Sequence, residues 1–159
     1  MSRLRVIGVG SPFGMDRIGL LAAERLLGMR DRLPEGAEVC LRDRPGMALL
    51  EDFEGADGVV ILDAVRGGRA GRIRCLDPGA LQALASPAST HGFGVAEVLA
   101  LAVALGRMPE RVRLIGVETG GDPQAEPPPQ LVAALVEQAL RTAWECARQA
   151  AHVDDCQAS

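Results

Sequence analysis

An apolar strand and the glycine-rich turn that follows it decide the fold of this chain. The stretch reads Leu4-Arg5-Val6-Ile7-Gly8-Val9-Gly10-Ser11-Pro12-Phe13-Gly14-Met15-Asp16-Arg17-Ile18-Gly19. Its pattern predicts a strand over about residues 3–9 and a helix over about residues 18–30. Open α/β sheets bind ligands outside the carboxyl ends of their strands, so Asp16 is well placed for chemistry. The alternative is that its side chain caps the helix.

Strands and helices alternate along the rest of the chain. We expect further strands at about 37–42, 58–63, 72–77 and 111–117, and helices at about 46–54, 79–85, 92–106 and 129–150. The link over residues 64–71 is too short for a parallel crossover, so the strand at 72–77 should run antiparallel. The predicted fold is α/β: a single-domain three-layer sandwich, with helices on both faces of a five-stranded, mostly parallel twisted sheet that has one antiparallel strand.

Length and composition bound the domain count and the partners. The 159 residues fit one α/β domain, which we assign to residues 1–150, followed by a polar tail at 151–159 that we expect to be frayed. The net charge of −4 and the absence of a basic cluster interleaved with aromatics indicate no nucleic-acid partner. No apolar run reaches the roughly 20 residues of a membrane span, and we see no signal peptide. We expect a cytoplasmic monomer.

The four cysteines carry no recognisable motif. Cys40, Cys75, Cys146 and Cys156 are scattered along the chain without a close pair. This spacing argues against a zinc knuckle or a redox motif. Cys40 and Cys75 fall within apolar, strand-like runs, so we expect both to be small buried hydrophobic residues.

Asp63 ends a continuous apolar run, Val59-Val60-Ile61-Leu62, of the kind found in central parallel strands. An unpaired buried carboxylate would cost free energy there, so a metal, a cation or several amide donors should meet it. The alternative is an Asp that caps the turn after the strand. His91 precedes a long apolar helix and is either a structural group with its own hydrogen bonds or a ligand. Asp16, Asp63 and His91 together would form a three-ligand site for a divalent metal such as nickel, zinc or iron.

The predicted topology brings these residues to one place. With the strand at 72–77 antiparallel, Asp16, Asp63, His91 and Glu118 all lie along one edge of the sheet. Glu118 follows the strand at about 111–117. It is either a solvated acid at a strand end or an acid that supports the site or contacts the substrate.

Competing motifs fail on spacing. Gly8, Gly10 and Gly14 miss the dinucleotide fingerprint, and the chain has no Gly-Lys-Ser/Thr phosphate loop. It also has no Gly-x-Ser-x-Gly elbow, and no cysteine stands at a predicted strand end or helix start. Ordinary serine or cysteine hydrolase chemistry is therefore not indicated. A nucleotide- or phosphate-binding α/β domain remains an alternative, supported only by the glycine-rich first turn.

Three stretches resemble the hydrogenase maturation proteases in order and approximate spacing. They are Gly8 to Gly19, Ile61-Leu62-Asp63-Ala64-Val65 and Ser89-Thr90-His91-Gly92, with weaker agreement at Arg42-Asp43-Arg44-Pro45-Gly46 and Leu114-Ile115-Gly116-Val117-Glu118. The family often has two adjacent acids followed by glycine in the first motif. Here Met15 precedes Asp16 and Arg17 follows it, so Arg17 adds a cation beside the site and bears on which large subunit fits.

The resemblance implies an activity and a site. It implies a cytoplasmic endopeptidase that removes the C-terminal extension of a nickel-iron hydrogenase large-subunit precursor after nickel insertion. Asp16, Asp63 and His91 match the family's two acids and histidine, which makes them both the metal contacts and the catalytic residues. The nickel belongs mainly to the substrate, so the isolated protein is metal-free or carries a surrogate divalent ion. A non-catalytic metal-binding or hydrogenase-maturation scaffold would use the same three ligands and is the first alternative.

Overall fold

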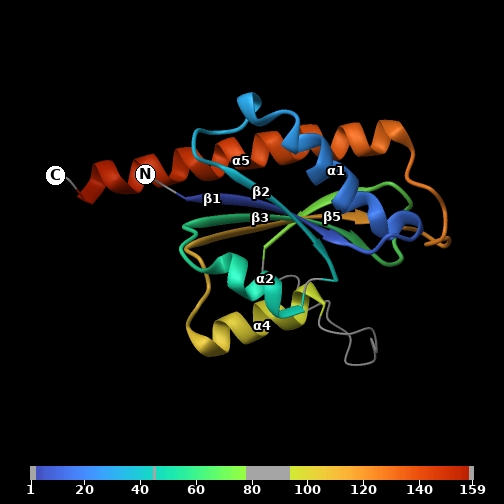
Figure 1. Ribbon diagram of the computed structural model, residues 1–159, viewed down its shortest axis with the longest axis horizontal. Helices are drawn as coiled ribbons and strands as arrows, with labels where there is room; N and C mark the ends of the chain where they lie inside the picture. The colour runs from blue at the N-terminus through green and yellow to red at the C-terminus, as the bar shows by residue number, and fades with distance from the viewer. Residues whose placement is uncertain (1–2, 45, 78–93, 158–159) are drawn as a thin grey trace.

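A single five-stranded sheet forms the centre of the molecule (Figure 1). The computed structural model describes residues 3–44, 46–77 and 94–157, with side chains up to residue 150. The strands are β1 (Leu4–Gly10), β2 (Glu38–Asp43), β3 (Gly58–Val65), β4 (Ile73–Leu76) and β5 (Arg111–Glu118). Their order is β2-β1-β3-β5-β4, with β4 antiparallel to β5 and the other pairs parallel. The predicted mixed sheet and its antiparallel strand are confirmed.

Helices lie on both faces of this sheet. The helical elements described are η1 (Gly14–Arg17), α1 (Ile18–Leu27), η2 (Arg30–Arg32), α2 (Gly46–Phe53), α4 (Val95–Leu105) and α5 (Pro129–Gln157). Figure 1 shows α1 and α5 on one face and α2 and α4 on the other. The three-layer arrangement is therefore as predicted. The helix expected at 79–85 lies outside the described residues.

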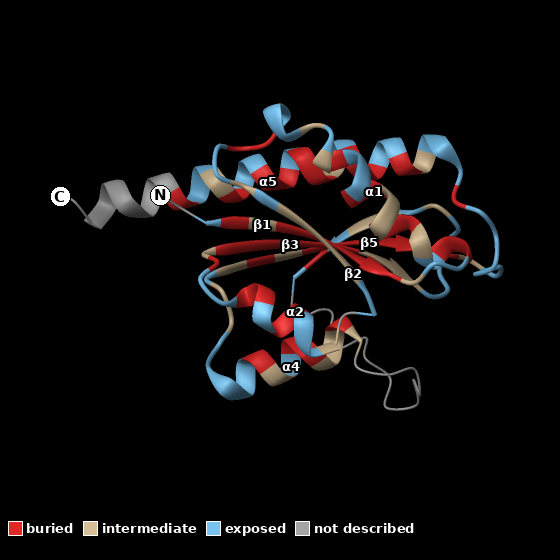
Figure 2. Cartoon of the chain, in the orientation of Figure 1, coloured by how far each residue is buried: buried red, intermediate tan, exposed pale blue. Residues whose placement is uncertain are grey.

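The sheet separates two apolar cores. Side chains alternate across a strand, so Val60 and Leu62 of β3 pack under α1 and α5, whereas Val59 and Ile61 pack toward α2 and α4. Figure 2 shows the inner strands buried along most of their length. A strand buried on both faces must be apolar throughout, which explains the continuous run before Asp63.

Two glycines bring α1 against the sheet at close range. A side chain on Gly8 of β1 would collide with the carbonyl oxygen of Gly19, and one on Gly19 would collide with the carbonyl oxygens of Val9 and Leu62. The start of α1 therefore lies directly over the ends of β1 and β3. This contact fixes the turn that carries Asp16 beside the strand that carries Asp63.

The last helix is longer than the sequence predicts. We expected it to end near residue 150, but α5 continues to Gln157. Residues 151–157 contain no Pro or Gly that would stop a helix, so the backbone continues through the polar segment.

Among the described residues, no helix is long and apolar enough to cross a membrane. The assignment of one domain to residues 1–150 stays a prediction.

One of the two cysteines expected in the core is exposed. Cys40 of β2 is half-buried, and burial raises the pKa of its thiol. Cys75, however, is exposed. Both cysteines lie on edge strands, but β4 is short and thinly covered, with Leu76 as its one buried residue, and Cys75 meets the half-buried side chain of Gln138 from α5 at 3.5 Å.

Candidate active site

Four residues, three acids and one histidine, were predicted to lie at the carboxyl edge of the parallel strands, and the structure places the three acids there. Asp63 lies near the end of β3, Glu118 ends β5, and Asp16 lies in η1, directly after β1. Val65 pairs with Glu118 across β3 and β5, which sets the two strand ends at the same level. His91 lies outside the described residues, in the segment of sequence that precedes α4.

Asp63 is a half-buried carboxylate with one hydrogen bond. Its Oδ1 accepts the backbone N–H of Ala64 at 2.8 Å, and its Oδ2 has no hydrogen-bond donor among the described residues. The pKa of Asp63 is raised to about 8, chiefly by burial and less by the negative charge of Asp16, while the hydrogen bond from Ala64 acts to lower it. The turn-capping alternative therefore accounts for only one oxygen. The rest of the carboxylate is suited to a cation.

Asp16 is exposed and has no side-chain partner within the described residues. The alternative that it caps a helix is wrong: Phe13 and Arg17 are the residues that precede η1 and α1, and neither helix start has a side-chain cap. The backbone carbonyl of Asp16 instead accepts the N–H of Ser11 at 3.2 Å. The main chain is thus anchored while the carboxylate is free to meet a ligand.

Glu118 is not the solvated strand-end acid that we considered. It is 4% exposed. Its Oε2 accepts the backbone N–H of Arg69 at 2.6 Å, and its Oε1 lies 3.5 Å from Nη1 of Arg74. These contacts hold the loop between β3 and β4 against the end of β5. A signal for this ion pair was present in the sequence. Arg74 lies on the strand that was expected to run antiparallel, and such a strand can bring an arginine to the acid that ends β5.

The two residues beside Asp16 have structural contacts of their own. Met15 is buried in the core beneath α1 and α5, and its N–H donates to the carbonyl of Pro123 at 3.0 Å. Arg17 forms an ion pair with Glu126 at 3.4 Å. The turn that carries Asp16 is therefore tied to the segment that leads into α5, and the Arg17 cation is partly neutralised.

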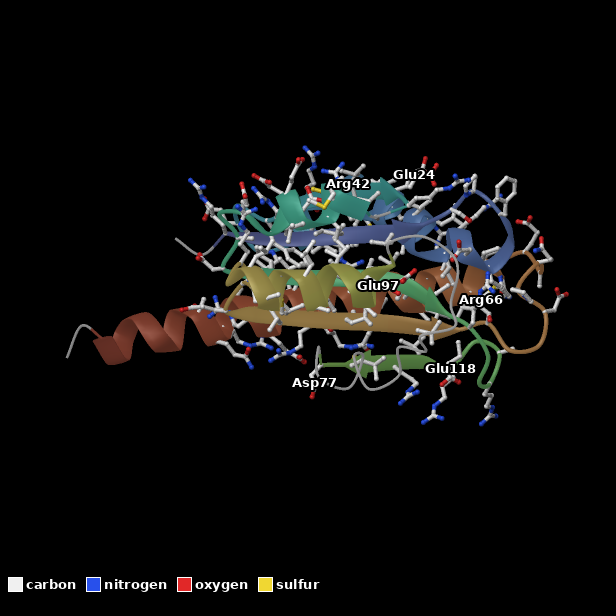
Figure 3. The ribbon with its side chains drawn as sticks, turned by 90° about the horizontal axis from the view of Figure 1, so that it is seen from below. Glu24, Arg42, Arg66, Asp77, Glu97 and Glu118 are labelled. Atoms are coloured by element: carbon white, nitrogen blue, oxygen red, sulfur yellow. The ribbon has the colours of Figure 1, made fainter. Side chains whose placement is uncertain are left out.

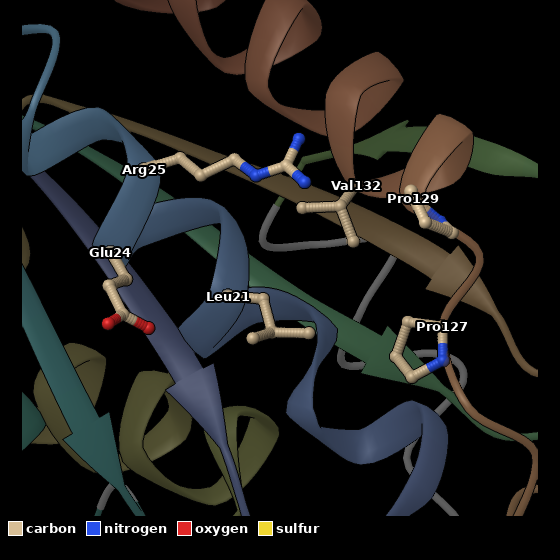
Figure 4. A pocket seen from close by; sticks show the side chains of 6 residues that line it. All are labelled: Leu21, Glu24, Arg25, Pro127, Pro129 and Val132. Carbon is tan, nitrogen blue, oxygen red and sulfur yellow. The ribbon is translucent and has the colours of Figure 1, made fainter.

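Two hollows lie near the α1 and α5 side of the sheet. One, of about 500 Å³, includes Met15, Ala70, Thr119, Ala125 and Leu131 in its lining. The other, of about 460 Å³, lies between α1 and the start of α5 and is lined by Leu21, Glu24, Arg25, Pro127, Pro129 and Val132 (Figure 4). None of the predicted site residues lines the second hollow. The first approaches the site through Met15, the neighbour of Asp16.

Two carboxylates and an imidazole, the donors predicted at Asp16, Asp63 and His91, suit a divalent transition metal. Within the described part of the chain, no three His, Cys, Asp or Glu side chains are grouped closely enough to hold a metal ion. Asp16 and Asp63 are near enough for their charges to interact. Two carboxylates that repel one another fit a cation, and a third donor would have to come from outside the described residues or from a ligand.

Acids at the carboxyl edge of an open parallel sheet define a class of α/β proteins that bind ligands at that edge. Comparison with known proteins narrows this class. The chain belongs to the hydrogenase maturation protease family, because the HycI model of that family matches residues 44–147. The family is a peptidase family, which favours an enzyme over the scaffold and nucleotide-binding alternatives.

Relatives and solved structures agree with this assignment. The hydrogenase expression/formation protein HoxM of Azotobacter vinelandii is 31% identical over 155 residues, which cover 88% of this chain and 70% of HoxM. The hydrogenase maturating endopeptidase HybD from E. coli is 29% identical, with a TM-score of 0.71 and 93% of each chain covered. The NiFe hydrogenase maturation protease HycI from Thermococcus kodakarensis is 25% identical, with a TM-score of 0.65 over 89% and 90% of the two chains.

Proposed function

We propose that this chain is a cytoplasmic endopeptidase that removes the C-terminal extension of a nickel-iron hydrogenase large-subunit precursor after nickel insertion. It recognises the precursor's nickel through Asp16, Asp63 and His91. Family membership supports the peptidase activity and the hydrogenase substrate. The observation that supports the metal contact is the pair Asp16 and Asp63: the negative charge of Asp16 raises the pKa of Asp63, and no described cation pairs with either carboxyl group.

The nickel is part of the substrate, and as a Lewis acid it would polarise the scissile carbonyl or a water molecule. Asp16 presents an exposed carboxylate that can reach a metal held by another protein. Asp63 is fixed at one oxygen by Ala64 and leaves the other available. Because the pKa of Asp63 is raised to about 8, its carboxyl holds a proton near neutral pH and releases it when a cation arrives.

Cleavage of the nickel-loaded precursor tests this function. We expect the wild-type protein to shorten the precursor, measured as a loss of mass, and to leave the nickel-free precursor intact. The variant Asp16→Asn/Asp63→Asn/His91→Ala should lose at least about 100-fold in rate, because it removes both carboxylates and the imidazole together.

The matched control is Asp31→Asn, which removes an exposed carboxylate in η2, between α1 and β2. It should cleave at the wild-type rate. Full cleavage by the folded triple variant would contradict the proposed site. Binding of the precursor without any change in its mass would favour the non-catalytic scaffold instead.

A further inference from the structure

The loop between β3 and β4 is an ordered structure built around a buried acid. Glu118 accepts the N–H of Arg69 with its side chain and the N–H of Gly71 at 2.9 Å with its backbone carbonyl. Thr119 supports the other side, because its Oγ1 accepts the N–H of Gly67 at 3.3 Å. Glycine is required at position 68, since a side chain there would collide with the Glu118 carboxylate. The loop therefore presents its side chains from a fixed backbone.

This loop presents three arginines that have no counter-ion among the described residues. Residues 66–76 contain Arg66, Arg69, Arg72 and Arg74 and no acid. Arg74 is paired with Glu118, whereas the exposed side chains of Arg66, Arg69 and Arg72 form no ion pair with the described residues. This is a local excess of positive charge in a chain whose net charge is −4. A surface of this kind is complementary to carboxylates on a partner.

The cationic loop lies beside the candidate site. Arg66 follows the end of β3, the strand that carries Asp63, and Figure 3 shows Arg66 and Glu118 at the same end of the sheet. A hollow of about 360 Å³ is lined by Arg69, Ala70, Gly71 and Arg72. Ala70 and Gly71 also line the 500 Å³ hollow that contains Met15. The two hollows thus adjoin across the loop.

We propose that the loop at residues 66–72 is the docking surface for an acidic, extended segment of the precursor. Its carboxylates would bind Arg69 and Arg72, and an apolar side chain of the same segment would enter the hollow beside Met15. This inference rests on the proposed function, since it takes the precursor as the partner. Continuity of the surface with the Asp16 and Asp63 edge favours the precursor over an unrelated polyanion. The 360 Å³ hollow is lined by the cations Arg69 and Arg72, which suits the carboxylates of the segment. The 500 Å³ hollow is lined by Met15 and Leu131 but also by Asp122 and Glu126, so the part of the segment that enters it must be apolar rather than acidic.

Charge reversal tests the cationic part. Arg69→Glu/Arg72→Glu should raise KM for the nickel-loaded precursor about ten-fold at low salt while kcat at saturation is unchanged. The wild-type KM should rise with added salt, and that of the variant should not. Both side chains are exposed and the loop is held through backbone groups, so the variant should fold, as checked by circular dichroism and Tm.

The matched control changes the net charge by the same amount elsewhere. Arg30→Glu/Arg148→Glu reverses two exposed arginines that have no described ion pair, one in η2 and one in α5. Its KM should equal that of the wild type. Equal increases in both double variants would mean that only net charge matters, and would overturn the proposal.

Filling the apolar hollow tests the second part. Ala125→Trp places a large side chain in its lining and should raise KM about five-fold, whereas Ala133→Trp, at an exposed position of α5, should not. An unchanged KM for Ala125→Trp and for the arginine variant, with normal wild-type cleavage, overturns the docking surface alone. A wild-type protein that neither binds nor cleaves the precursor overturns the proposed function as well.

A different partner would give a different result. If the loop serves a nucleic acid or a lipid surface, the wild type should bind polyadenylate RNA or vesicles containing phosphatidylglycerol. Arg69→Glu/Arg72→Glu would then abolish that binding and leave KM for the precursor unchanged. That outcome overturns the proposal. Rescue of the double variant by a precursor whose acidic segment is changed to lysine supports it directly.

Discussion

Asp63 and Glu118 stand near the ends of neighbouring parallel strands, each after a run of apolar residues. Glu118 is almost fully buried and is met by an amide and a guanidinium from the β3–β4 loop and β4. Asp63 is half-buried and receives one amide, and the charge that faces it is that of another acid, Asp16. A strand-end acid is therefore a functional candidate when its neighbours fail to neutralise it.

The largest change in stability should come from removing Glu118, the acid that is paired. Glu118→Ala should lower the free energy of unfolding by about 3 kcal/mol, because it leaves the Arg69 N–H without an acceptor and Arg74 without its ion pair. Urea denaturation measures this loss. The kcat at low temperature should be retained. Glu24→Ala, an exposed acid of α1, is the control and should change stability by less than about 0.5 kcal/mol.

Replacement of Asp63, which has no ion pair among the described residues, should change the free energy of unfolding in the opposite direction. Asp63→Asn should raise the free energy of unfolding of the metal-free protein by about 1–2 kcal/mol at pH 7, while cleavage is lost. The gain should grow as pH rises from about 4 to about 8, because over this range the unfolded chain ionises Asp63 and the folded chain, whose pKa is raised to about 8, keeps it protonated. A loss of stability like that of Glu118→Ala would reveal a structural partner.

The smallest change in stability is expected at Arg44, at the end of β2. Arg44 follows β2 and is the one residue other than glycine with a positive φ, 59°, in the described backbone. Its N–H donates to the carbonyl of Gly10 at 2.9 Å, beside the turn that leads to Asp16. Arg44→Gly relieves the strain and should raise the free energy of unfolding by about 0.5 kcal/mol. Arg44→Val should lower it, and equal stabilities would show that the conformation costs nothing.

The sequence predicted the fold well because its signals were local and strong. Continuous apolar strands such as β3, the short 64–71 link and the long apolar helices each restricted the topology on their own. The end of α5 was missed because polarity predicts exposure rather than loss of helix. Cys75 was misplaced because a short apolar run does not reveal how far the neighbouring helices cover its strand.

The site was less predictable because partners come from distant segments. The strand ends indicated that Asp16 and Asp63 lie at one edge, but no local pattern showed that Asp16 lacks a cap or that Glu118 binds the Arg69 amide. The left-handed backbone of Arg44 was equally hidden, since the residue type disfavours it. The assignment of catalytic roles to Asp16, Asp63 and His91 stays a prediction.

The close packing of Gly8 against Gly19 also bears on the stage of folding at which the candidate site forms. Asp16 and Asp63 become neighbours only after β1 and β3 pair, and the chain between these strands passes through α1, β2 and α2. Closing that long loop is costly in entropy and belongs to the slow, non-local part of folding. A nascent or partly unfolded chain therefore lacks the paired carboxylates. If cleavage depends on this pair, as proposed above, the protein cannot cut its substrate until its own fold is complete.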